Sequence, residues 1–296
     1  MRNVASATLG GVVAEAATPR RAQEYSIDLG ATLELVDFLG DSGISGILLL
    51  GSAGEFVHFA LHDRIHMVNF AVKRSRLPIF VNVSHSTLDG AVELAREAAN
   101  AGASALLLMP PYYYHYSEET ICSFFLAFAN EVGDAAPVYV SETSASAAIQ
   151  LLATGLFAGI VGSLDDIRTV AGNSIQLPFQ LLAGCERIYS GARALGAAGV
   201  VSGIASAIPE LMVAFDNALR TGTQERAARL EARVIEFVDW TGELPFPIGI
   251  KEAGKQRKLK MGAFAVAPGE HEGRKLEEFR RWLADWLPAV LKECRQ

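Results

Sequence analysis

The sequence has few cysteines, and their arrangement excludes two kinds of structure. Cys122, Cys185 and Cys294 are an odd number, lie far apart and form no CxxC pair. This pattern excludes a disulfide framework and a zinc site built on paired cysteines. Reduced thiols are typical of the cytoplasm, so we expect a cytoplasmic protein. We also expect no cofactor.

The chain also lacks an excess of positive charge and any long apolar run. Lys and Arg number 26 against 33 Asp and Glu, a net charge of −7, so the basic stripe that nucleic-acid binding needs is missing. No apolar run approaches the ~20 residues of a membrane span. Residues Met1–Gly10 contain one Arg and no long hydrophobic core, so we expect no secretory signal.

Half of the 296 residues are apolar, enough for a large core, and many of them fall in short continuous runs. Continuous apolar runs, in contrast to alternating ones, are typical of parallel strands that are buried on both faces. The runs are Gly11–Ala14, Gly46–Leu50, Pro78–Val81, Ala105–Met109, Pro137–Val140, Ala158–Val161, Gln180–Ala183 and Gly199–Ser202.

Between these runs the apolar residues have helical spacing, as in Ala91–Ala98 and Ile121–Ala129. No GxGxxG turn follows the first run, which favours a closed barrel over an open dinucleotide-binding sheet. We therefore predict an α/β fold, a (β/α)8 TIM barrel over residues 8–222. Residues 223–296 are predicted to form the last barrel helix and a C-terminal helical extension of the same body.

The active site of such a barrel lies at the carboxyl ends of its strands. Gly51–Glu55 follows the second run, Pro110–Tyr114 the fourth and Gly184–Glu186 the seventh. The first of these turns offers backbone N–H groups and a hydroxyl, which together can hold a carboxylate. A tight turn with a helix-capping Glu explains the same residues equally well.

Taken together, these phrases resemble the dihydrodipicolinate synthase / N-acetylneuraminate lyase family of class I aldolases, from about Gly11 to Leu287. The phrases that carry the resemblance are Thr18-Pro19, Ser26–Asp28, Gly51–Phe56, Pro111–Tyr113 and Phe246–Lys251.

The resemblance implies a lysine that ends strand six and forms a Schiff base with the keto group of a 2-keto acid. It also implies a tyrosine that ends strand five and shuttles protons, and paired hydroxyls in the strand-two turn that hold the carboxylate. The imine makes the keto acid an electron sink, so that a carbon–carbon bond can form or break.

This chain departs from that pattern at the lysine. The matching position in strand six holds Val161, and no lysine occurs between Lys73 and Lys251. Removing a covalent nucleophile costs many orders of magnitude in rate. We therefore predict that the protein has no Schiff-base aldolase or synthase activity.

Two further family positions differ. Ser141 stands at the strand-five tyrosine position, with Tyr139 two residues earlier and one layer deeper, and Ala53 replaces the second hydroxyl of the strand-two turn. Tyr113, after strand four, and Ser52, as a carboxylate donor, are kept.

Lys251 lies in a segment, Gly249–Ala253, that resembles the family's strand-six lysine motif but follows strand six by many residues. We expect it to be a helix-end or interface charge.

His58, His62 and His66 have a spacing that can place metal ligands on one helix face. On an outer helix, a solvated or subunit-interface stripe is the better interpretation.

His85, Glu142 and Glu186 follow strands three, five and seven, so all three can face the barrel mouth. There they can supply acid–base chemistry or bind a divalent cation, or each can simply cap a helix. Cys185 is better explained as a small packed thiol, since no His adjoins it in the sequence.

Two functional hypotheses remain. The first is an enzyme of this superfamily that binds a small 2-keto or hydroxy acid, a carboxylate, without an imine. The second is a non-catalytic ligand-binding barrel or an inactive partner of an active paralogue, in short a pseudoenzyme.

The tyrosine-rich Tyr112–Tyr116 segment favours a homodimer or homotetramer, because the resemblance implies that one such tyrosine enters the neighbouring subunit's site. The expected catalytic residues are Tyr113, Glu142, Glu186 and His85, and the expected substrate contacts are Ser52, Ala53, Ser141, Val161, Gly184 and Val201.

Overall fold

The computed structural model describes residues 9–21 and 26–295. The expected start of the barrel at residue 8, the end of the expected extension at residue 296, and most of the Met1–Gly10 segment lie outside these described residues. Within them, no helix combines the length and the apolar composition that crossing a bilayer requires.

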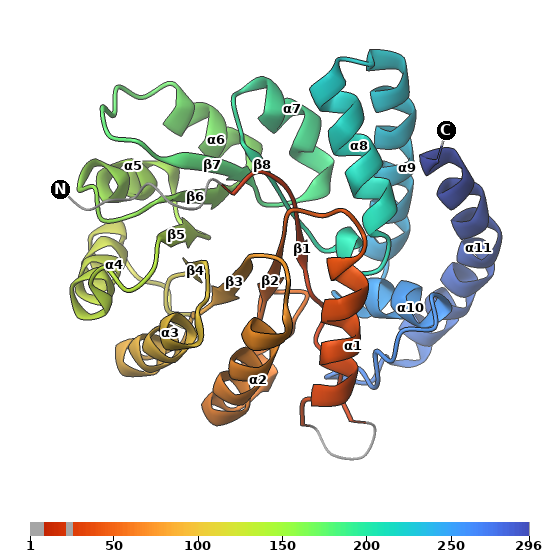
Figure 1. The fold of residues 1–296 in the computed structure, drawn as a ribbon, viewed down its shortest axis with the longest axis horizontal. Coiled ribbons are helices and arrows are strands. Elements are labelled where there is room, and N and C mark those ends of the chain that lie inside the picture. The colour runs from red at the N-terminus through yellow and green to blue at the C-terminus, as the bar shows by residue number, and fades with distance from the viewer. Residues whose placement is uncertain (1–8, 22–25, 296) are drawn as a thin grey trace.

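The strands form a closed parallel barrel in the order β1 to β8, as the apolar runs predict (Figure 1). Closure is direct, because Val13 of β1 is aligned both with Gly46 of β2 and with Val201 of β8. The predicted TIM barrel is confirmed. The strands are β1 Gly11–Glu15, β2 Gly46–Leu49, β3 Ile79–Asn82, β4 Ala105–Leu108, β5 Val138–Ser141, β6 Gly159–Gly162, β7 Gln180–Ala183 and β8 Gly199–Ser202.

Helices surround the barrel and alternate with the strands (Figure 1). Side-chain caps fix where several of them begin: Asp28, for example, accepts a hydrogen bond from the Ala31 N–H at 3.0 Å. The barrel helices are α1 Leu29–Gly40, α2 Leu61–Arg74, α3 Leu88–Ala101, α4 Glu118–Val132, α5 Ala145–Ala153, α6 Leu164–Ala171, α7 Tyr189–Ala194 and α8 Pro209–Thr221.

The inside of the barrel is a packed core and not a channel. Val13, Phe80, Tyr139 and Leu182 belong to this inner cluster and are almost completely buried. The Tyr139 hydroxyl donates a hydrogen bond to Gln180 at the start of β7, so it points away from the carboxyl ends of the strands. Within the barrel, the described residues leave open space at the mouth above this core.

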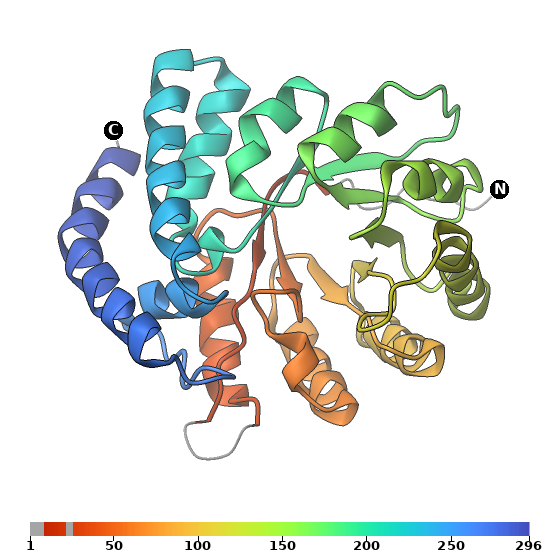
Figure 2. The same ribbon diagram turned by 180° about the vertical axis from the view of Figure 1, so that it is seen from behind.

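The C-terminal part of the chain forms three helices, α9 Gln224–Gly242, α10 Ile248–Gln256 and α11 Glu270–Cys294, which lie along one side of the barrel (Figures 1 and 2). The helix that follows β8 is α8, whereas the sequence predicts the last barrel helix after residue 222. Pro209 in its first turn explains the early start, because proline is preorganised for that position.

Candidate functional site

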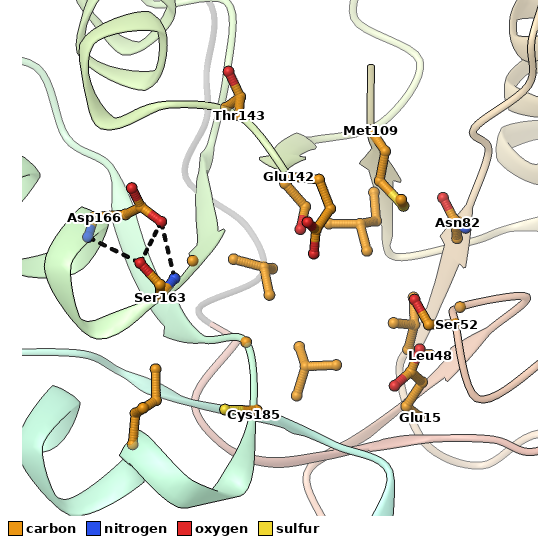
Figure 3. Close-up of a pocket in the computed structure, with 18 of the residues that line it drawn as sticks. Glu15, Leu48, Ser52, Asn82, Met109, Glu142, Thr143, Ser163, Asp166 and Cys185 are labelled. Atoms are coloured by element: carbon orange, nitrogen blue, oxygen red, sulfur yellow. Dashed lines mark hydrogen bonds between the residues drawn. The ribbon is translucent and has the colours of Figure 1, made fainter. Parts of the chain in front are cut away.

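A cavity of about 600 Å³ opens at the carboxyl ends of the strands (Figure 3). Every strand of the barrel or the residues just after it contribute to its wall, as expected for the functional end of a TIM barrel. Six of the expected site residues line this cavity: Ser52, Ser141, Glu142, Val161, Gly184 and Val201.

Glu186 does not line the cavity but lies buried behind its wall. Its carboxylate accepts hydrogen bonds from the Ser202 hydroxyl at 2.7 Å and from the Ile204 N–H at 2.8 Å. These contacts fasten the end of β7 to the turn after β8. The structure therefore gives Glu186 a bracing role, in line with the alternative that it is a loop-stabilising polar group.

His85 lies on the loop between β3 and α3, also outside the cavity wall. Its Nδ1 accepts a hydrogen bond from the Thr87 N–H at 3.1 Å and lies 3.0 Å from the Thr87 hydroxyl, at the N-cap of α3. Burial, followed by the nearby Arg64 charge, lowers the pKa of His85. A neutral, cap-bound imidazole at this place is a local structural element.

Tyr113 is 87% exposed and does not line the cavity of its own chain. Its backbone has φ = 93°, a left-handed value that is uncommon for a bulky residue. Its ring contacts that of Tyr114 edge-on at 4.9 Å. The expected catalytic residues Glu142, Glu186, His85 and Tyr113 are thus not brought together in one subunit.

Glu15, at the end of β1, is a cavity residue that was not predicted from the sequence. Its Oε1 accepts a hydrogen bond from the Ala53 N–H at 3.0 Å. The carboxyl group lies over Gly51, where an added Cβ would be only 2.1 Å from Oε1. Glycine at position 51 is what lets Glu15 settle on the strand-two turn.

Burial raises the pKa of Glu15 to about 7. The backbone N–H groups of Ser52 and Ala53 oppose this shift, while the neighbouring carboxylates of Glu186 and Glu142 add to it. A carboxyl group with a pKa near the operating pH can both accept and donate a proton. Of the described cavity residues, Glu15 has the electrostatic setting that best suits acid–base chemistry.

Glu142 follows β5 and directs its carboxylate into the open space toward which Glu15 also points (Figure 3). Its φ of 53° is left-handed, a conformation that costs energy in a residue with a side chain. Such local strain is common at functional sites. The two carboxylates make the floor and one wall of the cavity acidic.

Asn82, at the end of β3, was also missed and fixes the shape of the mouth. Its Nδ2 donates to the Leu50 carbonyl at 2.7 Å, and its Oδ1 accepts from the Ser84 N–H at 3.1 Å. The Ser84 hydroxyl in turn accepts from the Met109 N–H at 2.8 Å. These bonds connect the ends of three neighbouring strands, so Asn82 has a positioning role.

Val161 of β6 contributes an aliphatic side chain to the cavity. Of the described residues that line the cavity, none is a lysine or an arginine. Cys185 is an exposed residue at the rim of the cavity. Partial desolvation of its thiol, followed by the Glu186 charge, raises the pKa of Cys185 and so disfavours the thiolate. The wall thus offers carboxylates and hydroxyls but no amine.

Lys251 is completely buried in α10, so the expected helix-end or interface charge is a wrong interpretation. Its Nζ is bonded to the Glu55 carboxylate and to the Ala263 carbonyl at 3.2 Å. Arg20 adds a second cation, with its Nε 3.8 Å from Glu55. Burial lowers the pKa of Lys251, and the Glu55 charge opposes that effect. This group holds the strand-two turn to α10.

His58, His62 and His66 are exposed on and just before α2. In the part of the chain that the structure describes, no three His, Cys, Asp or Glu side chains are grouped closely enough to hold a metal ion. The histidine stripe is therefore solvated in the single chain.

Comparison of the sequence with known proteins identifies the family of the chain. Residues 8–283 match the sequence profile of the dihydrodipicolinate synthetase family. The chain belongs to this family. A 4-hydroxy-tetrahydrodipicolinate synthase of Methanococcoides burtonii is 24% identical over 265 residues, which cover 86% of this chain and 91% of the relative. A probable 2-dehydro-3-deoxy-D-pentonate aldolase of Escherichia coli is 25% identical over 261 residues, 83% of this chain and 87% of the relative.

Solved structures of other proteins share the fold. An Escherichia coli prophage protein in complex with pyruvate has a TM-score of 0.84 at 22% identity, covering 95% of this chain and 99% of that one. A catalytic lysine mutant of the Ruminococcus gnavus sialic acid aldolase also has a TM-score of 0.84, at 20% identity, with 98% and 100% covered. At these identities the likeness establishes the architecture, and the chemistry depends on this chain's own residues.

Proposed function

We propose that this family member binds a small polar molecule at the barrel mouth and moves protons there with Glu15 and Glu142, without Schiff-base chemistry. A cytoplasmic setting agrees with its unpaired, scattered cysteines. The observation that carries the proposal is the cavity wall, which presents Val161 and two carboxylates but no amine from any described residue. An imine needs a primary amine within reach of the carbonyl, and Lys251 is buried in an ion pair elsewhere.

Borohydride trapping tests this proposal. Incubating the protein with pyruvate and sodium borohydride is expected to leave the mass of the intact chain unchanged, because no cavity amine captures the keto group. The double variant Glu15→Ala, Val161→Lys serves as the positive control, since it places an amine on the cavity wall and removes the Glu15 carboxyl, and it is expected to gain a reduced pyruvate adduct. A reduced adduct on the wild-type chain, mapped to any residue of the mouth, overturns the proposal.

The 2-keto or hydroxy acid expected from the sequence remains a prediction. The acidic wall disfavours an anionic ligand, because like charges at short range repel in a partly buried site. A thermal-shift screen against keto acids, sugar acids, neutral sugars and divalent metals tests it, since a bound ligand raises the melting temperature according to its occupancy.

A non-catalytic barrel, or an inactive partner of an active paralogue, is the second candidate. Val161 favours it, because the family resemblance implies a Schiff-base lysine at this position and the chain has an aliphatic side chain there. If the protein converts a ligand found in the screen and the Glu15→Gln variant does not, the result supports the hypothesis that the protein is an enzyme. Stable binding without turnover supports the ligand-binding barrel.

We also propose that the chain forms a homodimer or homotetramer through its tyrosine-rich loop. Tyr113 and Tyr114 are 87% and 67% exposed, an unusual exposure for adjacent aromatic side chains. Sedimentation velocity is expected to show an oligomer that the double variant Tyr113→Ala, Tyr114→Ala shifts toward monomer. Leu177→Ala, at an exposed apolar residue outside this loop, should leave the distribution unchanged. A monomeric wild-type protein contradicts this prediction.

A further inference from the structure

The turn after β2 has the shape of an anion-binding cradle, and in this chain it is already filled. Its backbone N–H groups at Ser52 and Ala53 both act on the Glu15 carboxyl, the second through a 3.0 Å hydrogen bond. Successive backbone N–H groups that point into one concavity bind a carboxylate well. Here the carboxylate comes from the protein itself.

The Glu15 carboxyl group packs tightly onto the strand-two turn. Glu15 lies against Gly51 so closely that an added Cβ there would be 2.1 Å from its Oε1 and 2.8 Å from its Cδ. The cradle N–H groups are directed at Glu15, so a ligand carboxylate would have to displace a side chain that is anchored on β1. Displacement would leave two carboxylates competing for one set of donors.

The other residues of the barrel mouth also disfavour a ligand carboxylate. Glu142 and Asp166 contribute further carboxylates to the wall, and no described lining residue carries a positive charge. Asp166 is itself bonded to Ser163 in the N-terminal cap of α6, so Glu142 remains the carboxylate that faces the open space (Figure 3). The cavity is rich in hydrogen-bond acceptors, which suits a ligand with O–H or N–H donors.

We propose that Glu15 is a specificity-determining residue that occupies the carboxylate cradle of the barrel mouth, so that the site takes a small uncharged, donor-bearing ligand and rejects a carboxylate. This inference deepens the proposed function, on whose barrel-mouth site it rests. The built-in carboxyl takes the place that a ligand's carboxylate would otherwise need, and the acceptors around it select hydroxyl or amide groups.

The test compares pyruvate with pyruvamide, which has nearly the same shape but no charge. Calorimetric titrations at pH 8 use the wild-type chain, Glu15→Ala and Glu15→Gln. In Glu15→Ala the cradle is empty, and pyruvate affinity is expected to rise by roughly tenfold or more, because charge-assisted hydrogen bonds to free N–H donors become available. The wild type is expected to bind pyruvamide more tightly than pyruvate.

Glu15→Gln is the matched control, because its amide removes the charge while its Oε1 can still accept the Ala53 N–H. Its gain in pyruvate affinity is expected to stay well below that of Glu15→Ala. Glu15→Ser is a second variant that empties the cradle should the alanine variant fail to fold, as judged by circular dichroism.

Three results overturn the inference. The first is a pyruvate affinity in the emptied variants no higher than in the wild type, which includes no detectable binding to either. The second is an equal gain in Glu15→Gln, which would make charge and not occupancy the cause. The third is a wild type that prefers pyruvate to pyruvamide. None of these results produces a borohydride-trapped adduct, so failure here is distinct from failure of the imine-free proposal.

Discussion

Lys251→Met is expected to lower the free energy of unfolding by about 3–5 kcal/mol, the usual cost of removing one partner from a buried ion pair. Lys251 is completely buried, and among the described residues its loss leaves the Glu55 carboxylate with the more distant Arg20 at 3.8 Å and the Ala265 N–H at 3.1 Å. Urea unfolding, followed by circular dichroism, measures the change.

Lys255→Met is the matched control on the same helix. Lys255 is one-third exposed and lies 3.6 Å from Glu252, so its loss is expected to cost about 0–1 kcal/mol. If the two variants lose equal stability, the buried pair between α10 and the strand-two turn does not stabilise the fold as described.

Glu15→Gln is expected to stabilise the protein by about 1–3 kcal/mol at pH 8 and to change little at pH 5. The native carboxyl has a pKa of about 7 against an ordinary value of 4.5. Between these values the native state holds a proton that the unfolded state has released, so wild-type stability falls as the pH rises from about 5 to 7. Glutamine does not titrate and avoids this loss.

Urea unfolding of both proteins at pH 5, 6, 7 and 8 measures the difference. Glu118→Gln is the control with the opposite sign, because hydrogen bonds from Ser144 and Ser146 hold the pKa of Glu118 below its ordinary value. That variant should be less stable than the wild type throughout this range, and the deficit should fade only at more acidic pH. A pH-independent effect of Glu15→Gln contradicts the prediction.

The barrel could be predicted from the sequence because burial on both faces leaves a direct mark on it. A strand such as Ala105–Leu108 is buried on both faces, so its sequence is a continuous apolar run that predicts a strand. The end of the barrel was harder to predict. Helix α8 is shorter than the charged segments that follow it, and its start depends on a single proline at position 209.

The site was predicted in part, and the reasons differ from residue to residue. Ser52, Glu142 and Val161 follow or end strands and do line the mouth. Glu15 ends the first run in the same way, and the same rule would have found it. Glu186 follows a strand too, yet it turns behind the wall because the Ser202 hydroxyl and the Ile204 N–H offer it partners there, which spacing along the chain does not reveal.

The partnership of Lys251 with Glu55 left no signal in the sequence at all. The two residues are 196 positions apart, and nothing near Lys251 announces a buried acceptor. A lysine after an apolar phrase is ordinarily a surface residue. Only the three-dimensional closure of α10 onto the strand-two turn makes the pair.

That pair also bears on how the protein is made. As the chain leaves the ribosome, Glu55 emerges long before Lys251, since 196 residues separate them. A domain of this kind folds as a unit during synthesis, and a buried carboxylate without its cation is costly. The strand-two turn that shapes the ligand pocket therefore reaches its final environment only after α10 has been synthesised.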